Sequence, residues 1–285
     1  MIYKLGSVNS NREGFERLAE LWSAASPLMA RSLELDLSNC ASFDANMASP
    51  LGAVLALIAD NLNRIEIVGV QGPIESSLRR NQFLTNYAYL PLETGATVLP
   101  YRRFQVKDER LFGEYLRRYL PGKGFPRMTE GAGKVFQQSI FEIFQNAVAH
   151  SESRLGVFVC GQFFPNELRL NFTISDAGIG LSNRVRSFLG NQALTSEAAI
   201  QWALEGGNTT RTGSRPGGVG LKFLHDFVRR NRGNIQIVSG DGLYGATTGY
   251  DKLNSGLPGT TVNFEINTAD TQSYHLDGVK PEEIF

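Results

Sequence analysis

The sequence predicts an α/β protein in which a small α/β domain precedes a larger α/β sandwich with helices packed on a mixed sheet. The first observation behind this prediction is that segments with helix and strand periodicity take turns along the chain. The second is the length of 285 residues, since about 150 residues per domain leaves room for two. The third is a change in charge near Pro100: residues 1–100 carry 7 basic and 10 acidic side chains, and the remainder carries 21 and 18. We therefore expect one domain over 1–100 and another over 101–285.

The elements expected in the first domain follow from the spacing of its apolar residues. Phe15, Leu18 and Trp22 share one face of a helix. Pro27 ends this helix, because the residue before a proline is disfavoured in helical conformation. In chain order we expect a helix around 15–22, a strand over 33–37, a helix over 51–62, a strand over 65–68 and a helix over 74–81.

The second domain opens with an amphipathic helix and continues without the strict period of a doubly wound fold. In chain order we expect helices over 109–119 and 133–150, strands over 156–160 and 168–174, helices over 196–204 and 221–230, and strands over 235–238 and 261–266. This irregular alternation favours a layered sandwich.

Composition argues against several classes of protein. Lys and Arg total 28 and Asp and Glu total 28, so the chain lacks the excess positive charge with which nucleic-acid-binding proteins neutralise phosphates. Two cysteines, Cys40 and Cys160, are too few for a disulfide framework or a zinc cluster and indicate buried thiols in a reducing compartment. No apolar stretch approaches the ~20 residues that span a bilayer, and the first residues lack the pattern of a signal peptide. We expect a cytoplasmic protein that does not bind membranes. The balanced charge disfavours nucleic acid as a partner, although local basic patches would still allow it.

Three polar residues recur along one edge of the long helix of the second domain. Glu142, Asn146 and His150 are spaced at i, i+4 and i+8 and therefore line one face. Ile143 and Ala147 are expected to face away from them, into the core. A carboxylate beside an amide oxygen suits a hard cation such as Mg²⁺ and an activated water. A solvated helix edge would explain the same pattern.

Two short glycine motifs stand at the ends of expected strands. Asp176 follows a strand and precedes Gly178 and Gly180, an arrangement that can present a carboxylate to a ligand while the backbone approaches closely. Thr260 and Thr261 bring two hydroxyls to the start of the last strand. Either motif alone also occurs in ordinary turns.

A glycine-rich loop over 206–221 holds six glycines, and both of its charged residues, Arg211 and Arg215, are arginines. The loop ends where a helix begins, near Leu221, and the first amides and the dipole of a helix attract phosphate. It lacks the G-x-x-x-x-G-K-[ST] pattern of a P-loop. A flexible linker would not explain why the glycines gather at a helix start.

These motifs occur in the order found in the Bergerat fold. A helix with Glu-x-x-x-Asn is followed by Asp-x-Gly-x-Gly, by a glycine-rich lid that closes onto Gly-x-Gly-Leu, and by Gly-Thr leading a strand. This order resembles the nucleotide-binding domain of the GHKL ATPases and kinases over residues 105–268. The superfamily includes the gyrase ATPase subunit, the MutL repair proteins, a class of heat-shock chaperones, histidine kinases and anti-sigma-factor serine kinases. The resemblance implies that the chain binds ATP with Mg²⁺.

The resemblance also implies a role for each matching residue. Glu142 would be the catalytic residue that orients or deprotonates the attacking group, and Asn146 would coordinate Mg²⁺ between the phosphates. Asp176 would accept a hydrogen bond from the adenine amino group. His150 could equally be a structural histidine. The remaining nucleotide contacts would come from His150, Gly178, Gly180, Arg211, Arg215, Gly217, Gly218, Val219, Gly220, Leu221, and Thr260 or Thr261.

The first domain resembles a STAS domain, the sulfate-transporter and anti-sigma-antagonist module. The resemblance rests on the strand over 33–37, the turn at 43–44, the helix over 51–62 and the strand that ends at Gly69. In that family a phosphorylatable Ser or Thr commonly follows the Asp of the turn. Here Ala45 follows Asp44, so this position departs from the family pattern, although Ser42 and Ser49 lie nearby.

The leading hypothesis is an intracellular signalling protein that binds ATP, a Mg²⁺-dependent ATPase or Ser/Thr kinase of the GHKL type that acts on or through a protein partner. The STAS-like part would bind that partner. The sequence does not decide between a monomer and a homodimer. Linking the two domains would raise the effective concentration of one for the other. Two alternatives remain: a non-catalytic protein-interaction module gated by nucleotide, and an ATP-driven clamp-like ATPase. A histidine kinase fits less well, because no histidine precedes His150.

Overall fold

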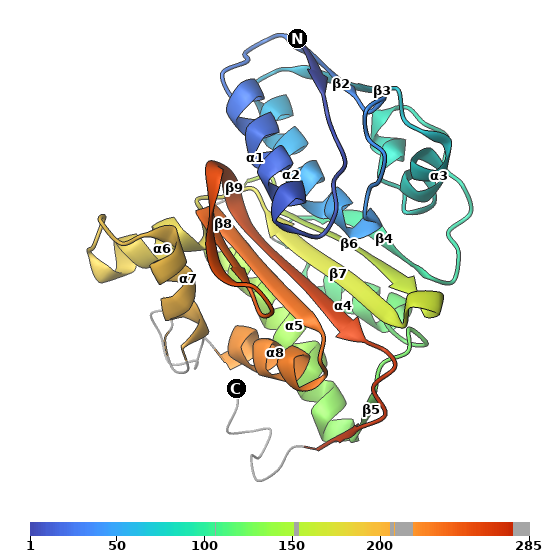
Figure 1. Ribbon diagram of the computed structural model, residues 1–285, viewed down its shortest axis with the longest axis vertical. Helices are drawn as coiled ribbons and strands as arrows, with labels where there is room; N and C mark the ends of the chain where they lie inside the picture. The colour runs from blue at the N-terminus through green and yellow to red at the C-terminus, as the bar shows by residue number, and fades with distance from the viewer. Residues whose placement is uncertain (106, 151–153, 206–207, 209–218, 276–285) are drawn as a thin grey trace.

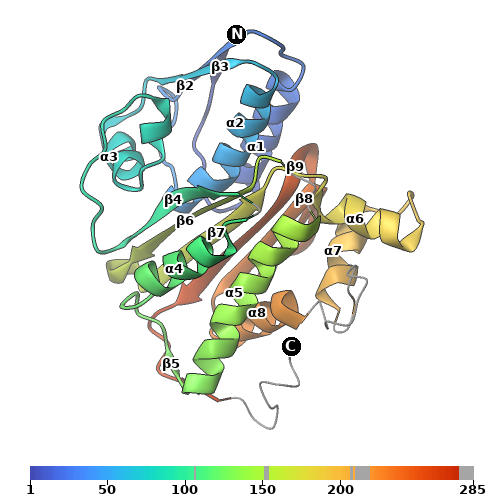
Figure 2. The ribbon, with the colours of Figure 1, turned by 180° about the vertical axis from the view of Figure 1, so that it is seen from behind.

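The computed structural model describes residues 1–105, 107–150, 154–205, 208 and 219–275 (Figure 1). It is a mixed α/β structure with a small parallel sheet, a larger antiparallel sheet, and helices that pack on both (Figures 1 and 2). The two main hydrophobic clusters lie on opposite faces of the larger sheet. The α/β class expected from the sequence is confirmed.

Residues 1–97, here called the N-terminal layer, contain three parallel strands in the order β1-β2-β3. The main elements are β1 (Ile2–Lys4), α1 (Arg12–Ala25), β2 (Ser32–Asp36), α2 (Ala48–Asp60), β3 (Arg64–Val68) and α3 (Gly72–Arg80). Two short 3-10 helices accompany them, η1 (Ala45–Met47) before α2 and η2 (Leu84–Tyr87) after α3. Helix α1 begins after Asn11, whose side chain accepts a hydrogen bond from the amide of Gly14. The helices and strands expected in this part of the chain are all present.

The larger sheet has five strands in the order β4-β6-β7-β9-β8. Their bounds are β4 (Val98–Phe104), β6 (Val157–Phe164), β7 (Arg169–Asp176), β8 (Asn234–Gly245) and β9 (Gly249–Asn267). Every pairing among these strands is antiparallel, so the expected mixed sheet is wrong for them. Apolar spacing marks a strand but not its direction. Here β6 and β7 are joined by a short turn, and so are β8 and β9, which makes both pairs antiparallel.

Three helices cover one face of the five-stranded sheet (Figure 2), namely α4 (Glu109–Tyr119), α5 (Glu130–His150) and α8 (Val219–Arg230). Two further helices, α6 (Gly180–Leu189) and α7 (Ser196–Leu204), contact the strand β8 at one edge. Two short strands, β5 (Arg127–Met128) and β10 (Ser273–Tyr274), pair in parallel beside the start of α5. Within the described residues, no helix combines the length and the apolar composition needed to cross a membrane.

The structure departs from the expected elements in three places. Strand β4 crosses the expected domain boundary at residue 100. Helix α6 occupies a stretch between Asp176 and Ser196 for which the sequence predicted no element. Strands β8 and β9 form a hairpin much longer than the expected strands over 235–238 and 261–266, as Figure 1 shows. Glycine and polar residues between 239 and 258 interrupt the apolar alternation there, which explains why the pattern did not reveal the rest of the hairpin.

The N-terminal layer packs on the sheet face opposite to α4, α5 and α8 (Figure 1). Its hydrophobic cluster includes Phe158 of β6. At the junction, the fully buried amide of Asn46 donates hydrogen bonds to Thr173 Oγ1 at 2.9 Å and to Asn263 Oδ1 at 3.0 Å. A buried polar group that loses its partners costs about 1–3 kcal/mol, so these bonds tie the layer to one register on the sheet.

Candidate functional site

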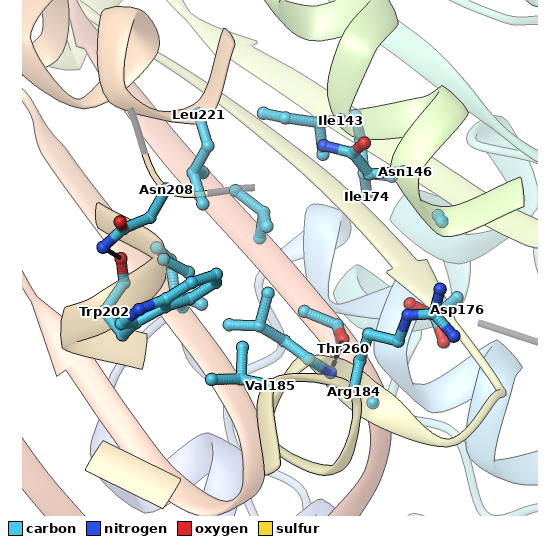
Figure 3. A pocket seen from close by; sticks show the side chains of 16 residues that line it. Ile143, Asn146, Ile174, Asp176, Arg184, Val185, Trp202, Asn208, Leu221 and Thr260 are labelled. Carbon is cyan, nitrogen blue, oxygen red and sulfur yellow. Dashed lines mark hydrogen bonds between the residues drawn. The ribbon is translucent and has the colours of Figure 1, made fainter. Parts of the chain in front are cut away.

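A cavity, here called the main cavity, opens between the five-stranded sheet and the helices α5, α6, α7 and α8 (Figure 3). It holds about 900 Å³ of empty space, including the part open to solvent. Its apolar wall includes Ile143, Ile174, Val185, Trp202, Leu221 and Val262. Its polar groups come from Asn146, Asp176, Arg184, Asn208 and Thr260.

Asp176 ends β7 and places its carboxyl group at one side of the main cavity (Figure 3). The residue is 4% exposed, and its Oδ1 accepts a hydrogen bond from the amide of Gly178 at 2.8 Å. Burial raises the pKa of Asp176 to about 7, although hydrogen bonds from Gly178 and Thr260 act in the opposite direction. A buried carboxyl group whose pKa is shifted toward neutrality, on the wall of a cavity, is a candidate for ligand binding.

Two glycines let the backbone approach Asp176 closely. Gly259 has φ of +72°, and a Cβ there would lie 2.0 Å from the carbonyl oxygen of Asp176. Gly180 has φ of +81°, and a Cβ there would lie 2.6 Å from the carbonyl oxygen of Gly259. Thr260 Oγ1 accepts a hydrogen bond from the amide of Leu181 at 2.8 Å. Glycine therefore allows the start of α6 and the strand β9 to meet at the carboxyl group.

We expect Gly259→Ala to destabilise the protein much more than Gly249→Ala. Both glycines belong to β9 and have positive φ, so both variants incur a strain of about 1–2 kcal/mol. Nothing lies within 4 Å of a Cβ at Gly249, whereas at Gly259 the added methyl group would overlap the backbone of Asp176. We expect a further loss of about 1–3 kcal/mol in the free energy of unfolding, measured in urea. Equal losses for the two variants would contradict the close approach.

Helix α5 presents Ile143, Asn146 and Ala147 to the main cavity. Ile143 and Ala147 pack in the hydrophobic cluster, as expected, and both also line the cavity. Helix α5 packs against both the sheet and α8. The side of α5 that faces the cavity therefore includes apolar as well as polar residues. Asn146, expected from the sequence to be a site residue, also lines the cavity.

Glu142 lies beside the start of α8 and is 5% exposed. Its Oε2 accepts a hydrogen bond from the amide of Gly220 at 2.8 Å. A Cβ at Gly220 would lie 2.6 Å from the same oxygen, so the contact requires glycine. Acidic side chains stabilise helix N-termini because the first amides lack partners within the helix. The residue expected to orient or deprotonate the attacking group thus bonds the beginning of the helix that the sequence assigned to phosphate binding.

Several expected site residues lie outside the described part of the chain. These are Arg211, Arg215, Gly217 and Gly218, together with the side chains of His150 and Val219. The sequence offered either Thr260 or Thr261 as a nucleotide contact, and of these two only Thr260 lines the main cavity. Thr261 Oγ1 instead donates to Ser175 Oγ at 3.0 Å, on the opposite face of the sheet. Successive residues of a strand point to opposite faces, so only one of the pair can face the cavity.

Eleven of the sixteen residues that line the cavity were not among the site residues expected from the sequence, and the polar or aromatic ones among them are Arg184, Trp202 and Asn208. Arg184 belongs to α6, a helix that the sequence did not predict. Trp202 and Asn208 lie on the side of the cavity opposite to Asp176, and the Asn208 amide donates to the Trp202 carbonyl oxygen at 2.9 Å (Figure 3). The sequence held one weak signal for them, namely an arginine and a tryptophan flanking the glycine motifs.

The main cavity can hold a ligand between apolar walls and offer it one carboxyl group, two amides, a guanidinium and a hydroxyl. Among the described residues, no group of three or more His, Cys, Asp or Glu side chains could hold a metal ion by itself. No protein-family model matches this chain, and no curated protein matches it.

Proposed function

We propose that the chain is an ATP-binding regulatory protein of the GHKL type and that the main cavity takes the nucleotide as a Bergerat fold does. The observation that carries the proposal is the buried carboxyl group of Asp176, held by Gly178 on the wall of an apolar cavity. Adenine presents an amino group that donates to a carboxylate, whereas guanine presents a carbonyl oxygen at the same position. The site therefore suits adenine and opposes guanine.

The rest of the main cavity suits the other parts of ATP. Apolar side chains from the sheet and from α8, such as Ile174, Val262 and Leu221, can contact the faces of the base. The first turn of α8 begins at the cavity, and helix N-termini bind phosphate. Glu142 is placed at this same helix start, where it would orient or deprotonate the attacking group.

The main cavity offers an oxygen ligand that suits Mg²⁺. Mg²⁺ prefers oxygen ligands and is usually held by one or two protein groups together with substrate phosphates. Asn146 lines the main cavity and supplies an amide oxygen, so it would be the protein ligand. A bound ion would neutralise charge on the phosphates.

We expect Asn146→Ala to weaken ATP binding in the presence of Mg²⁺ by about tenfold or more and to leave ADP binding in a chelator within about twofold. Only the first affinity depends on the proposed metal ligand. Asn183→Ala is the matched control, because Asn183 is an exposed amide of α6 that donates to the Ile179 carbonyl oxygen, and it should change neither affinity. Calorimetric titrations measure all four values. An unchanged magnesium dependence in Asn146→Ala would show that the amide is structural.

We infer that the phosphoacceptor or regulatory partner is a separate protein. The N-terminal layer, which resembles a STAS domain, contacts the sheet face opposite to the main cavity. Ser49, near the turn where that family is phosphorylated, is fully buried and its Oγ donates to the Phe158 carbonyl oxygen at 2.9 Å. This packing does not favour the expectation that the linked domains act on each other, and it leaves the layer's outer surface for a partner.

Nucleotide titration and ADP release together test the proposal. We expect ATP and ADP to bind and GTP to bind at least about tenfold more weakly, because an unpaired buried carboxylate costs about 1.5–3 kcal/mol. ADP release, measured with and without candidate protein partners, distinguishes an enzyme from a module that only binds nucleotide. Turnover would support an ATPase or kinase, whereas tight ATP binding without turnover under every condition would support the nucleotide-gated module. Equal affinity for ATP and GTP would refute the assignment of the site.

A further inference from the structure

A second cavity lies between the N-terminal layer and the outer strands of the five-stranded sheet. Its walls come from α2, β3, η2, β4 and β6, and it holds about 680 Å³ of empty space, including the part open to solvent. Small residues of α2 leave this room: Gly52 and Ala56 both line the cavity. A Cβ at Gly52 would lie 2.3 Å from the hydroxyl oxygen of Tyr101. Phe158 lines the cavity from the sheet face that the N-terminal layer covers, so the second cavity is separate from the main cavity.

Two tyrosine hydroxyls at this second cavity lack hydrogen-bond partners among the described residues. Tyr101 is 7% exposed and lines the cavity, and no side chain or backbone group of the described chain bonds its hydroxyl. The half-buried Tyr87 lines the cavity in the same way and also has no such bond. Among the described residues, neither hydroxyl oxygen is a buried polar atom without a partner, so both are open to the cavity. Each can therefore bond to a molecule that enters it.

Arg103 adds a positive charge at the edge of the second cavity. Its Nε donates to the Leu155 carbonyl oxygen at 2.5 Å, and its guanidinium lies over the ring of Phe158, 5.5 Å from the ring centroid. These two contacts hold the side chain in place. The two terminal nitrogens bond to no described residue, and no described carboxylate pairs with the guanidinium. Arg103 can therefore donate two hydrogen bonds to a ligand.

Three side chains at this cavity, those of Arg103, Tyr87 and Tyr101, can donate hydrogen bonds at neutral pH, and the exposed amide of Asn86 also lines it. Burial raises the pKa of Tyr87 and the pKa of Tyr101, and the nearby charge of Arg103 opposes the shift only in part. Both phenols thus stay protonated. No acidic residue lines the cavity, while Leu55, Ile65 and Phe158 offer apolar surface. Donors grouped around one cation favour an anionic group, and the apolar walls favour an organic body attached to it.

We propose that the second cavity binds a small organic carboxylate. Its carboxylate would accept hydrogen bonds from Arg103, Tyr87 and Tyr101, and its apolar body would pack against Phe158 and α2. This site is independent of the nucleotide proposal, because it shares no residue with the main cavity.

Benzoate and its uncharged counterpart benzamide test the proposal on the full chain, by titration followed by NMR. We expect benzoate to bind at millimolar concentration or below and benzamide to bind at least about tenfold more weakly, the difference expected for a charge-assisted hydrogen bond. Arg103→Gln should weaken benzoate by about tenfold or more and leave benzamide unchanged. Arg102→Gln is the matched control: the neighbouring arginine donates to Gln82 Oε1 at 2.5 Å, does not line the cavity, and should have no effect.

Ala56→Leu tests whether benzoate binds inside the second cavity, and the substitution changes no charge. The added side chain would fill the second cavity, so benzoate binding should be lost while the thermal unfolding midpoint and ATP affinity stay unchanged. Four results would each overturn the proposal. They are no benzoate binding at millimolar concentration, equal affinity for benzoate and benzamide, equal losses in Arg102→Gln and Arg103→Gln, and full benzoate binding in folded Ala56→Leu.

Discussion

Glu142→Gln is expected to reduce ATP turnover by about 10²–10⁴-fold while ATP affinity stays within a few-fold of the wild type. A group that positions or deprotonates the nucleophile acts in the transition state, so its loss lowers the rate more than the ground-state affinity. Glutamine keeps an oxygen that can accept the hydrogen bond now made by the Gly220 amide at 2.8 Å, but it cannot take a proton. The substitution therefore removes the chemistry and retains the contact with α8.

Glu142→Ala separates a chemical role from a structural one. Alanine removes both the base and the contact with Gly220, whereas glutamine removes only the base. If Glu142 served only to hold α8, Glu142→Gln would retain turnover and Glu142→Ala would lose it. Glu130→Gln is a control on the same helix, because Glu130 is exposed and pairs with Lys134 at 2.6 Å, and it should leave turnover unchanged. A wild-type protein that binds ATP but releases no ADP with any partner would make the chain a binding module.

Asp176→Asn is expected to weaken ATP and ADP by about tenfold or more and to reduce the preference for adenine over guanine nucleotides. The variant replaces a charge-assisted hydrogen bond to the adenine amino group with a neutral one, which accounts for the loss. Its amide oxygen can still accept the bond from Gly178, so the loop should keep its shape. A calorimetric comparison of ATP, ADP and GTP measures the effect. Unchanged ATP affinity in this variant would contradict adenine recognition by Asp176.

The raised pKa of Asp176 also makes nucleotide affinity depend on pH. Adenine needs the ionised carboxylate, and in the free protein this group titrates at about 7. Below that pH, each unit should weaken ATP binding by up to about tenfold, because the carboxyl group must first lose its proton. Asp176→Asn should remove this dependence between pH 5 and about 7, since asparagine does not titrate. A wild-type affinity that is flat across this window would show that the ionised form is not required.

The same shift predicts that Asp176→Asn stabilises the unliganded protein at high pH. The pKa of Asp176 is about 7 in the folded chain and near 3.8 in the unfolded one, so burial of the ionised form destabilises the fold. This cost is absent below pH ~4, grows as the pH rises from about 4 to about 7, and is complete above pH ~7. At pH 8 the variant should therefore be more stable by up to roughly 4 kcal/mol, and at pH 4 it should equal the wild type. Urea denaturation at the two pH values tests the sign.

Local patterns in the sequence determined most of the helices and the order of the site motifs. The bounds expected for α4 and α7, 109–119 and 196–204, agree with the structure because the amphipathic stripe of α4 and the Thr195 cap of α7 are properties of adjacent residues. Asp176 could be named for the same reason, since a carboxylate followed by two glycines at a strand end is a local arrangement. The lengths of β8 and β9 were missed where glycine and polar residues interrupt the local alternation.

The tertiary structure decided which distant residues meet, because periodicity reveals that a side chain is buried but not what it is buried against. Glu142 bonds the amide of Gly220, 78 residues away, and this partner follows only from the packing of α5 on α8. The N-terminal layer could have covered either face of the sheet, and Asn46 selects one through Asn263, 217 residues away. The second cavity arises in the same way, because Arg103 and Tyr87 are unremarkable in the sequence and become a site only when α2 packs across β4 and β6.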